Sequence, residues 1–246
     1  MMVGAFVPAS LSTLTLRYGF SLSNMTWITN SYEIAAVVSL LVVSHWGNYG
    51  HKGQWLGFGV IIFSIGSLIY VVANFVGPLY SKFDVGDFQY CAVTNDNASC
   101  PLFGPADGPP SGKEQGAPPG GFGGSGGGLN KVFYIFVLGQ IFMGAGSAPS
   151  FVLAPAYLDE NVSQKRSPKL LGVLMAASGA GPLLGTVLSY IYLKIFVDVG
   201  RRDLSEVNIK PDHPNWVGAW WLGFLTSGVL GLFFAIPLLG FARKLP

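Results

Sequence analysis

Residues 54–75, QWLGFGVIIFSIGSLIYVVANF, decide the fold class. The stretch contains no charged residue, and its length matches the roughly 20 apolar residues with which a helix crosses the hydrocarbon core of a bilayer. Backbone N–H and C=O groups in lipid have to be satisfied within the segment, so a helix is the expected conformation. The stretch therefore predicts a membrane-spanning helix.

Four further stretches have the same character, at residues 25–46, 132–157, 170–193 and 216–241. Residues 1–16 are also uncharged and fairly apolar. A signal peptide would place positive residues before the apolar run, whereas Arg17 follows it. We interpret residues 1–16 as the C-terminal part of a first spanning helix, so the sequence predicts six spans, the first of them incomplete.

The composition of the whole chain agrees with a membrane protein. Half of the 246 residues are hydrophobic, only 11% are charged and the mean hydropathy is +0.48, whereas soluble domains carry about 25% charged residues. The composition therefore argues against three classes of protein: soluble enzymes, secreted disulfide scaffolds and disordered proteins. A net charge of +2 gives no basis for nucleic-acid binding. No catalytic constellation or metal-ligand spacing appears, so we expect no enzymatic activity, cofactor or metal.

The spacing of the spans indicates two groups of three. Residues 1–75 hold the first three spans, and residues 132–246 hold the last three. Residues 76–131 form a long polar connection, within which residues 104–128 are so rich in Gly and Pro that we expect disorder. The expected fold is an all-α, six-helix membrane bundle, embedded in lipid and arranged as 3+3.

Basic residues favour one orientation in the membrane. They are densest in the short connections after the second, fourth and sixth spans: Lys52, Lys165, Arg166, Lys169, Arg243 and Lys244. Cytoplasmic loops carry an excess of Lys and Arg near the ends of spans. We therefore expect these connections and both termini to be cytoplasmic.

The long connection is then extracellular, and it carries two signals that suit that side. Asn97 begins an Asn-Ala-Ser glycosylation sequon, and Cys91 and Cys100 flank it. A disulfide beside a glycan is typical of an oxidising compartment. The alternative is two free cysteines and an unused sequon.

Glu33 is the only acidic residue well inside a predicted span. An acidic residue at the centre of a span costs roughly 2.5–3.5 kcal/mol on insertion scales, so Glu33 is expected to face the bundle interior or a wet cavity, with a donor nearby. One reading is a site that couples protons or substrate. The other is a structural carboxylate that is hydrogen-bonded to a neighbouring helix or reaches water at the interface.

Small residues and prolines recur in the fourth and fifth spans, notably Gly144, Gly146, Gly181, Pro182 and Gly185. The G-x-x-x-G spacing of Gly181 and Gly185 lets helix backbones approach closely, and Pro182 can bend a helix. These positions predict either a flexible hinge or tight static packing.

The segment WVGAWWLGFL at residues 216–225 opens the last span. Trp216 suits the headgroup level of a membrane. The adjacent Trp220 and Trp221 have to point in different directions on a helix, so one of them is expected to face protein or a cavity.

This segment resembles the signature of the organic anion transporting polypeptides, a family of the major facilitator superfamily. Shorter segments at residues 17–20 (RYGF), 31–34 (SYEI), 157–160 (YLDE) and 181–185 (GPLLG) also resemble family motifs. The family-signature positions that we single out are Trp216, Gly218, Ala219, Trp220, Trp221 and Gly223.

The resemblance implies a major-facilitator fold of twelve helices in two halves, of which this chain would supply the N-terminal half. Its partners would be the lipid bilayer, the C-terminal half of the same carrier and an organic anion. The implied activity is sodium-independent transport of large amphipathic anions, such as steroid conjugates, bile salts, prostaglandins and thyroid hormones, across the plasma membrane by alternating access.

For this pathway we expect Glu33 to be a buried polar anchor, Tyr32 an aromatic contact, and Trp220 and Trp221 to line the outer cavity. Two alternatives stay open. One is a truncated membrane protein that does not transport. The other is a different major facilitator, such as a proton-coupled sugar or drug carrier, for which Glu33 would have to titrate.

Overall fold

The computed structural model of the chain describes residues 3–47, 51–77, 127–199 and 216–240. This part forms six helices: α1 (Val3–Tyr18), α2 (Leu22–Trp46), α3 (Lys52–Val76), α4 (Gly127–Asn161), α5 (Ser167–Leu193) and α6 (Trp221–Leu239). Five of them, α2 to α6, are long and apolar enough to cross a membrane, and α1 has 16 residues. No sheet occurs among the described residues. The prediction of an all-α membrane protein is confirmed.

Four of the predicted spans fall within α2 to α5, but the start of the last span was predicted wrongly. We placed it at Trp216, whereas α6 begins at Trp221 and Trp220 is its N-cap. The described residues just before Trp221 do not form a helix, and Gly218 among them forms an isolated antiparallel bridge with Phe196. Hydrophobic composition alone did not separate this short pairing segment from the helix that follows it.

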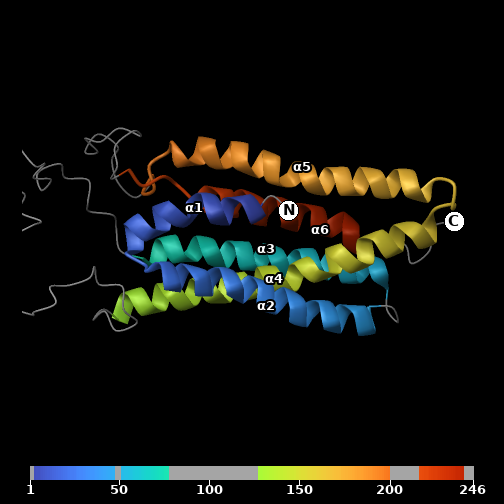
Figure 1. Cartoon of the computed structure of the whole chain (residues 1–246), viewed down its shortest axis with the longest axis horizontal. Helices are drawn as coiled ribbons and strands as arrows, with labels where there is room; N and C mark the ends of the chain where they lie inside the picture. Colours follow the sequence, from blue (N-terminus) through green and yellow to red (C-terminus); the bar gives the residue numbers. More distant parts are fainter. Residues whose placement is uncertain (1–2, 48–50, 78–126, 200–215, 241–246) are drawn as a thin grey trace, which may run out of the picture.

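The helices lie lengthwise beside one another as an elongated bundle (Figure 1). The central helix α3 packs against α4 on one side and α6 on another, α2 packs against α4, and α1 packs mainly against α5. Successive helices run in opposite directions. One end of the bundle therefore holds the end of α1 and the start of α2, and the other end holds the α4–α5 turn.

Buried aromatic rings form the main core near the end of the bundle where α1 ends. The Tyr70 ring lies 4.4 Å from the Phe224 ring and 4.7 Å from the Phe136 ring, measured between centroids. Tyr18 and Phe20 stack at 5.5 Å beside them. A smaller core lies elsewhere in the bundle and consists of Val43, Leu56, Ala148 and Leu153. The aromatic core ties α1, α3, α4 and α6 together.

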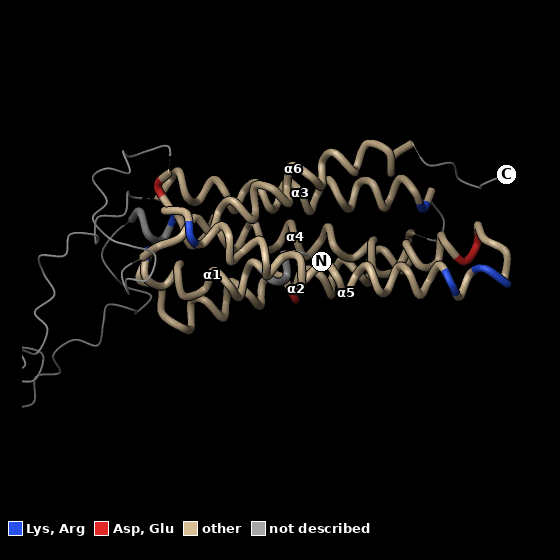
Figure 2. The backbone as a smooth tube through the Cα atoms, turned by 90° about the horizontal axis from the view of Figure 1, so that it is seen from above, with Lys and Arg blue, Asp and Glu red and all other residues tan. Residues whose placement is uncertain are grey.

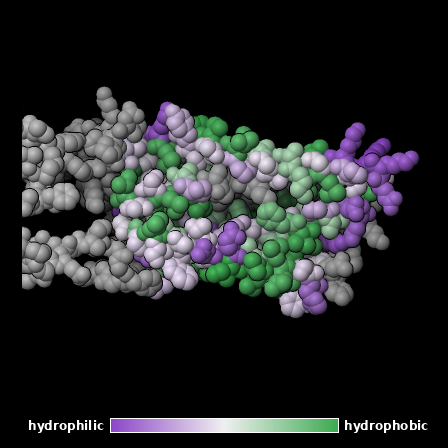
Figure 3. Space-filling view, viewed as in Figure 1, coloured by the Kyte–Doolittle hydropathy of each residue, from purple (hydrophilic) through white to green (hydrophobic). Residues whose placement is uncertain are grey.

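The outer surface between the two ends is apolar. Leu41, Leu183 and Ile236 expose 69%, 72% and 71% of their area, which is the surface that a lipid-facing helix presents. Hydrophobic side chains cover broad areas of one face, and hydrophilic ones gather at the end that holds the α4–α5 turn (Figure 3). The charged positions lie mainly at the two ends of the bundle, and one acidic position lies midway (Figure 2).

Close helix contacts are made where glycine removes the side chain. A Cβ atom on Gly66 of α3 would lie 2.7 Å from the backbone nitrogen of Met143 in α4, and one on Gly144 would lie 3.1 Å from the Cβ atom of Ala35 in α2. No side chain fits at such distances. Small residues therefore let the backbones of α2 and α3 approach α4.

Candidate functional site

The segment before α6 pairs with the residues that follow α5. The Val197 N–H donates to the Val217 carbonyl at 3.0 Å, and the Ala219 N–H donates to the Ile195 carbonyl at 2.8 Å. Gly218 lies directly on the end of α5, because a Cβ atom there would come within 2.5 Å of the Leu193 Cα atom. The glycine is therefore required for this pairing.

Two of the three tryptophans in residues 216–225 donate hydrogen bonds from their indole N–H groups to the end of α5 and the segment after it. Trp216 Nε1 donates to the Leu193 carbonyl at 2.8 Å, and Trp221 Nε1 donates to the Val197 carbonyl at 2.9 Å. The Trp221 ring also lies 5.9 Å from the Phe75 ring at the end of α3. These carbonyls lie at and just after the end of α5, where a helix leaves acceptors without intrahelical partners.

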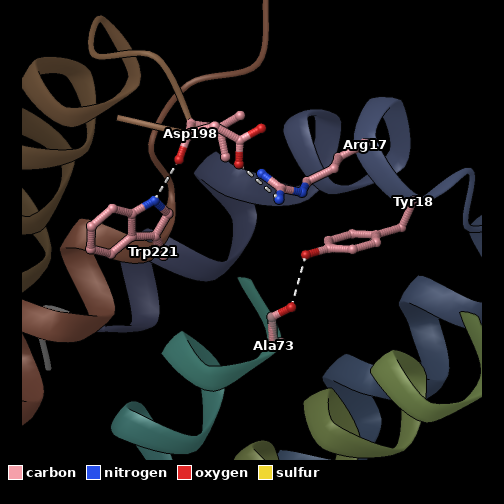
Figure 4. Close-up of polar contacts among 6 residues, drawn as sticks. Arg17, Tyr18, Ala73, Asp198 and Trp221 are labelled. Atoms are coloured by element: carbon pink, nitrogen blue, oxygen red, sulfur yellow. Dashed lines mark hydrogen bonds and ion pairs between the residues drawn. The ribbon is translucent and has the colours of Figure 1, made fainter. Parts of the chain in front are cut away.

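A buried ion pair joins α1 to this segment (Figure 4). Arg17 donates to Asp198 Oδ1 at 3.1 Å, and the two side chains are only 1% and 0% exposed. The next residue, Tyr18, donates its hydroxyl to the Ala73 carbonyl of α3 at 3.2 Å. We call the set Arg17, Tyr18, Asp198, Trp216 and Trp221 the clasp. It fastens α1, α3, α5 and α6 to one another at one end of the bundle.

A second set of polar contacts lies at the opposite end. Lys52, the first residue of α3, forms an ion pair with Glu160 of α4. Asp159 accepts a hydrogen bond from the Ser167 hydroxyl at the start of α5. These contacts fasten the α4–α5 turn to α3.

A cavity of about 680 Å³ opens between α1, α2, α3, α4 and α6. Its polar wall consists of Thr29, Tyr32, Glu33, Gln140, Ser147, Ser150 and Ser227. Its apolar wall includes Val7, Leu11, Phe63, Phe151, Leu230 and Phe234. The cavity therefore has an aliphatic and aromatic side and a side of hydroxyl, amide and carboxyl groups.

Glu33 lies in this cavity, but the expectation that it would be buried is wrong. The residue is exposed in the described part of the chain, midway along α2, and contributes to the open cavity wall. Tyr32 is half-buried beside it. The carboxylate reaches the cavity because α2 is covered by protein on its α4 side and leaves this face open.

The structure does not place Trp220 or Trp221 in this cavity. Trp220 is 3% exposed, and its ring lies 5.6 Å from Phe136 in the aromatic core. Its buried Nε1 meets no hydrogen-bond acceptor within the described residues. Trp221 belongs to the clasp. Both side chains are thus positioned to hold helices together.

The predicted packing or hinge positions separate into two kinds. Gly144 and Gly146 of α4 lie against the backbones of α2 and α3, and Gly146 also lines the cavity. On α5, Gly185 is buried, Gly181 is half-buried and Pro182 is exposed within an unbroken helix. The α4 glycines therefore allow close approach of helix backbones, whereas a hinge at the α5 positions stays a prediction.

Some predicted features lie outside the described residues, among them Cys91, Cys100, Asn97 and nearly all of the connection at residues 76–131. Sequence reasoning also missed an element that the structure shows, the Arg17–Asp198 pair. The sequence does show that Arg17 and Asp198 are charged residues next to apolar segments. Nothing in the sequence indicates that these two side chains contact each other.

Comparison with known proteins identifies relatives along the whole chain. The Organic Anion Transporter Polypeptide (OATP) family model matches residues 1–246. Solute carrier organic anion transporter family member 4A1 of Mus musculus is 33% identical over 100% of this chain and 31% of its own length. Member 4C1 of Homo sapiens is 31% identical over 100% of the chain and 30% of its length, and member 1B2 of Rattus norvegicus is 30% identical over 99% and 34%. The chain thus spans about a third of the length of these relatives.

Proposed function

Because the chain belongs to the OATP family of multi-pass membrane organic anion transporters, we propose that it forms part of a plasma-membrane carrier for large amphipathic anions. The carrier works by alternating access and without sodium. The proposed substrates are steroid conjugates, bile salts, prostaglandins and thyroid hormones. The single observation that supports this proposal best is the cavity beside Glu33.

The size and chemistry of the cavity suit such substrates. Pockets that hold small molecules measure roughly 300–1,000 Å³ and combine apolar walls with a few polar groups, and this cavity of about 680 Å³ has that composition. The apolar wall matches a steroid or aromatic skeleton. The polar wall, with Tyr32 and Glu33, matches substituents on that skeleton, and we propose both residues as contacts.

The packing of the helices supports a 3+3 arrangement of the major-facilitator type. Exchanging the first triplet for the second converts the α1–α5 contact into the α4–α2 contact and leaves the α3–α6 contact unchanged, whereas the extensive α3–α4 contact has only a small counterpart between α6 and α1. Two inverted triplets related by such an exchange form one half of these carriers, and substrate binds between halves near the membrane midplane. We propose that the rest of the carrier supplies the opposite wall.

We propose that part of the family signature positions helices rather than contacting substrate. Gly218, Trp216 and Trp221 hold the end of α5 against the start of α6. A carrier that rocks needs each half to move as a rigid unit. Direct contact of Trp220 and Trp221 with substrate in an outer cavity rests on the family resemblance alone.

The test is uptake by cells that express the protein with any sequence that its transcript adds at either end. We expect saturable uptake of labelled estrone sulfate that taurocholate inhibits and that persists when choline replaces sodium. Ser150→Trp, which fills the cavity, should reduce uptake at least tenfold. The matched control is Ser44→Trp, because Ser44 is an exposed serine of α2 outside the cavity lining.

Three results would contradict the proposal. Absence of estrone sulfate uptake at normal surface expression would support a non-transporting membrane protein. Uptake of sugars driven by a proton gradient, without anion uptake, would support a different facilitator. Equal loss of uptake in the Ser150 and Ser44 variants would remove the cavity from the pathway.

A further inference from the structure

The cavity wall carries negative charge and no positive charge. Among the described residues that line it, Glu33 is the only one with a full charge, and none is Lys, Arg or His. A carboxylate repels another anion at short range, most strongly where apolar walls lower the effective dielectric constant. This wall is therefore not where the negative group of a substrate binds.

Three of the hydroxyl groups of the wall present acceptors as well. The hydroxyls of Thr29, Ser147 and Ser227 donate their protons to the carbonyls of Met25, Gly144 and Phe224 in their own helices. Each hydroxyl has one proton to donate and two lone pairs, so these three oxygens offer only lone pairs to the cavity.

The amide of Gln140 donates one of its two Nε2 protons to the Tyr70 hydroxyl at 3.2 Å, and its Oε1 atom is a further acceptor. Glu33 lies among these acceptors and is exposed to the cavity, so a ligand can reach its carboxylate. One carboxylate in a cavity that also holds hydroxyl acceptors and apolar walls is an environment for a group with several N–H donors and a positive charge.

We infer that this wall binds the ammonium group of a zwitterionic amphipath, with Glu33 as its counter-ion and the hydroxyl oxygens of the wall as acceptors. The inference rests on the proposed function and narrows it. Among amphipathic anions, the preferred substrates carry an ammonium group in addition to the carboxylate. The negative group binds away from Glu33, and the apolar skeleton packs on the wall that contains Phe63 and Phe151.

A matched pair of ligands isolates the ammonium group. Triiodothyronine carries an ammonium and a carboxylate, and triiodothyropropionic acid has the same iodinated rings and carboxylate without the ammonium. We expect the unmodified protein to take up the first with a higher kcat/KM than the second. Estrone sulfate serves as the reference for general transport.

Substitution of the carboxylate tests its role. Glu33→Gln should lower kcat/KM for triiodothyronine about tenfold, the factor that corresponds to about 1.4 kcal/mol. It should therefore lower the ratio of kcat/KM for triiodothyronine to kcat/KM for triiodothyropropionic acid, because only triiodothyronine loses a counter-ion. Glu33→Asp should restore part of the preference. The control Asn30→Gln alters an exposed α2 residue outside the cavity lining and should change neither substrate.

Other outcomes overturn the inference and separate it from the proposed function. Equal loss of all three substrates in Glu33→Gln would mean that the carboxylate pairs with a cation of the protein or supports the fold. Lack of discrimination by the unmodified protein, with estrone sulfate uptake intact, would reject the ammonium site alone. Lack of all uptake would reject the proposed function. In that case the melting temperature of the purified protein with each ligand would decide the inference. Triiodothyronine should raise the melting temperature more than triiodothyropropionic acid does, and Glu33→Gln should abolish this difference.

Discussion

Arg17 and Asp198 show how much a single contact contributes at the residue scale. Both charges are almost completely removed from solvent. Arg17 lies in the last turn of α1, and Asp198 lies in the segment that follows α5. Removing a charge from water costs several kcal/mol, which only a close partner offsets. The pair therefore fixes where the α5–α6 connection meets the end of α1, and either charge alone would be destabilising.

This dependence predicts a strong coupling between the two positions. Arg17→Met removes the guanidinium that donates to the buried Asp198 carboxylate, and Asp198→Leu removes the carboxylate that accepts from Arg17. Each should lower the free energy of unfolding by about 3–5 kcal/mol, whereas the double variant should recover most of that loss. Thermal melting of the three purified variants in one detergent measures the coupling. Additive losses in the double variant would show that the two charges do not stabilise each other.

At the element scale, α4 shows how close backbone packing joins neighbouring helices. It packs against both α2 and α3, and glycines on both sides remove the side chains that would separate the backbones. Helices in lipid gain no hydrophobic driving force from meeting each other, so close backbone packing carries much of the association. By contrast, α5 makes fewer contacts with the bundle, and its Gly172 and Gly179 face open space.

Alanine substitutions should separate the packed glycines from the open ones. A Cβ atom on Gly146 would lie 2.8 Å from the Phe63 Cα atom, so Gly146→Ala should destabilise the protein by about 1–3 kcal/mol. Gly179→Ala is the matched control, because no atom lies within 4 Å of its Cβ position, and better helix propensity should stabilise it by up to about 1 kcal/mol. Melting temperatures in detergent measure both. A melting temperature of Gly146→Ala equal to or above that of the parent would contradict the packing.

The sequence predicted the helices well because lack of charge over a fixed length is a local property. Residues 54–75 and 170–193 were assigned correctly on that basis. The burial of Glu33 was not predicted correctly, because exposure depends on which helices leave an opening beside α2. The start of α6 was missed for a related reason. Gly218 pairs with Phe196, and a local sequence pattern does not reveal a pairing between residues this far apart in the chain.

At the scale of the whole molecule, the two ends of the bundle differ in chemistry. The clasp closes one end with a buried ion pair and indole hydrogen bonds. The other end is closed by the Lys52–Glu160 pair and carries Lys165, Arg166 and Lys169 in or beside the α4–α5 turn. An excess of Lys and Arg in short connections favours the cytoplasmic side. We therefore propose that the clasp faces the cell exterior.

Single cysteines on exposed serines test this orientation. Ser23 lies at the start of α2, at the clasp end, and Ser163 lies in the α4–α5 turn; both are exposed. A membrane-impermeant maleimide added to intact cells should label Ser23→Cys above the parent protein, whose own cysteines are Cys91 and Cys100. It should label Ser163→Cys only after permeabilisation, because the proposed orientation places that turn in the cytoplasm. The reverse pattern would invert the protein in the membrane and place the clasp on the cytoplasmic side.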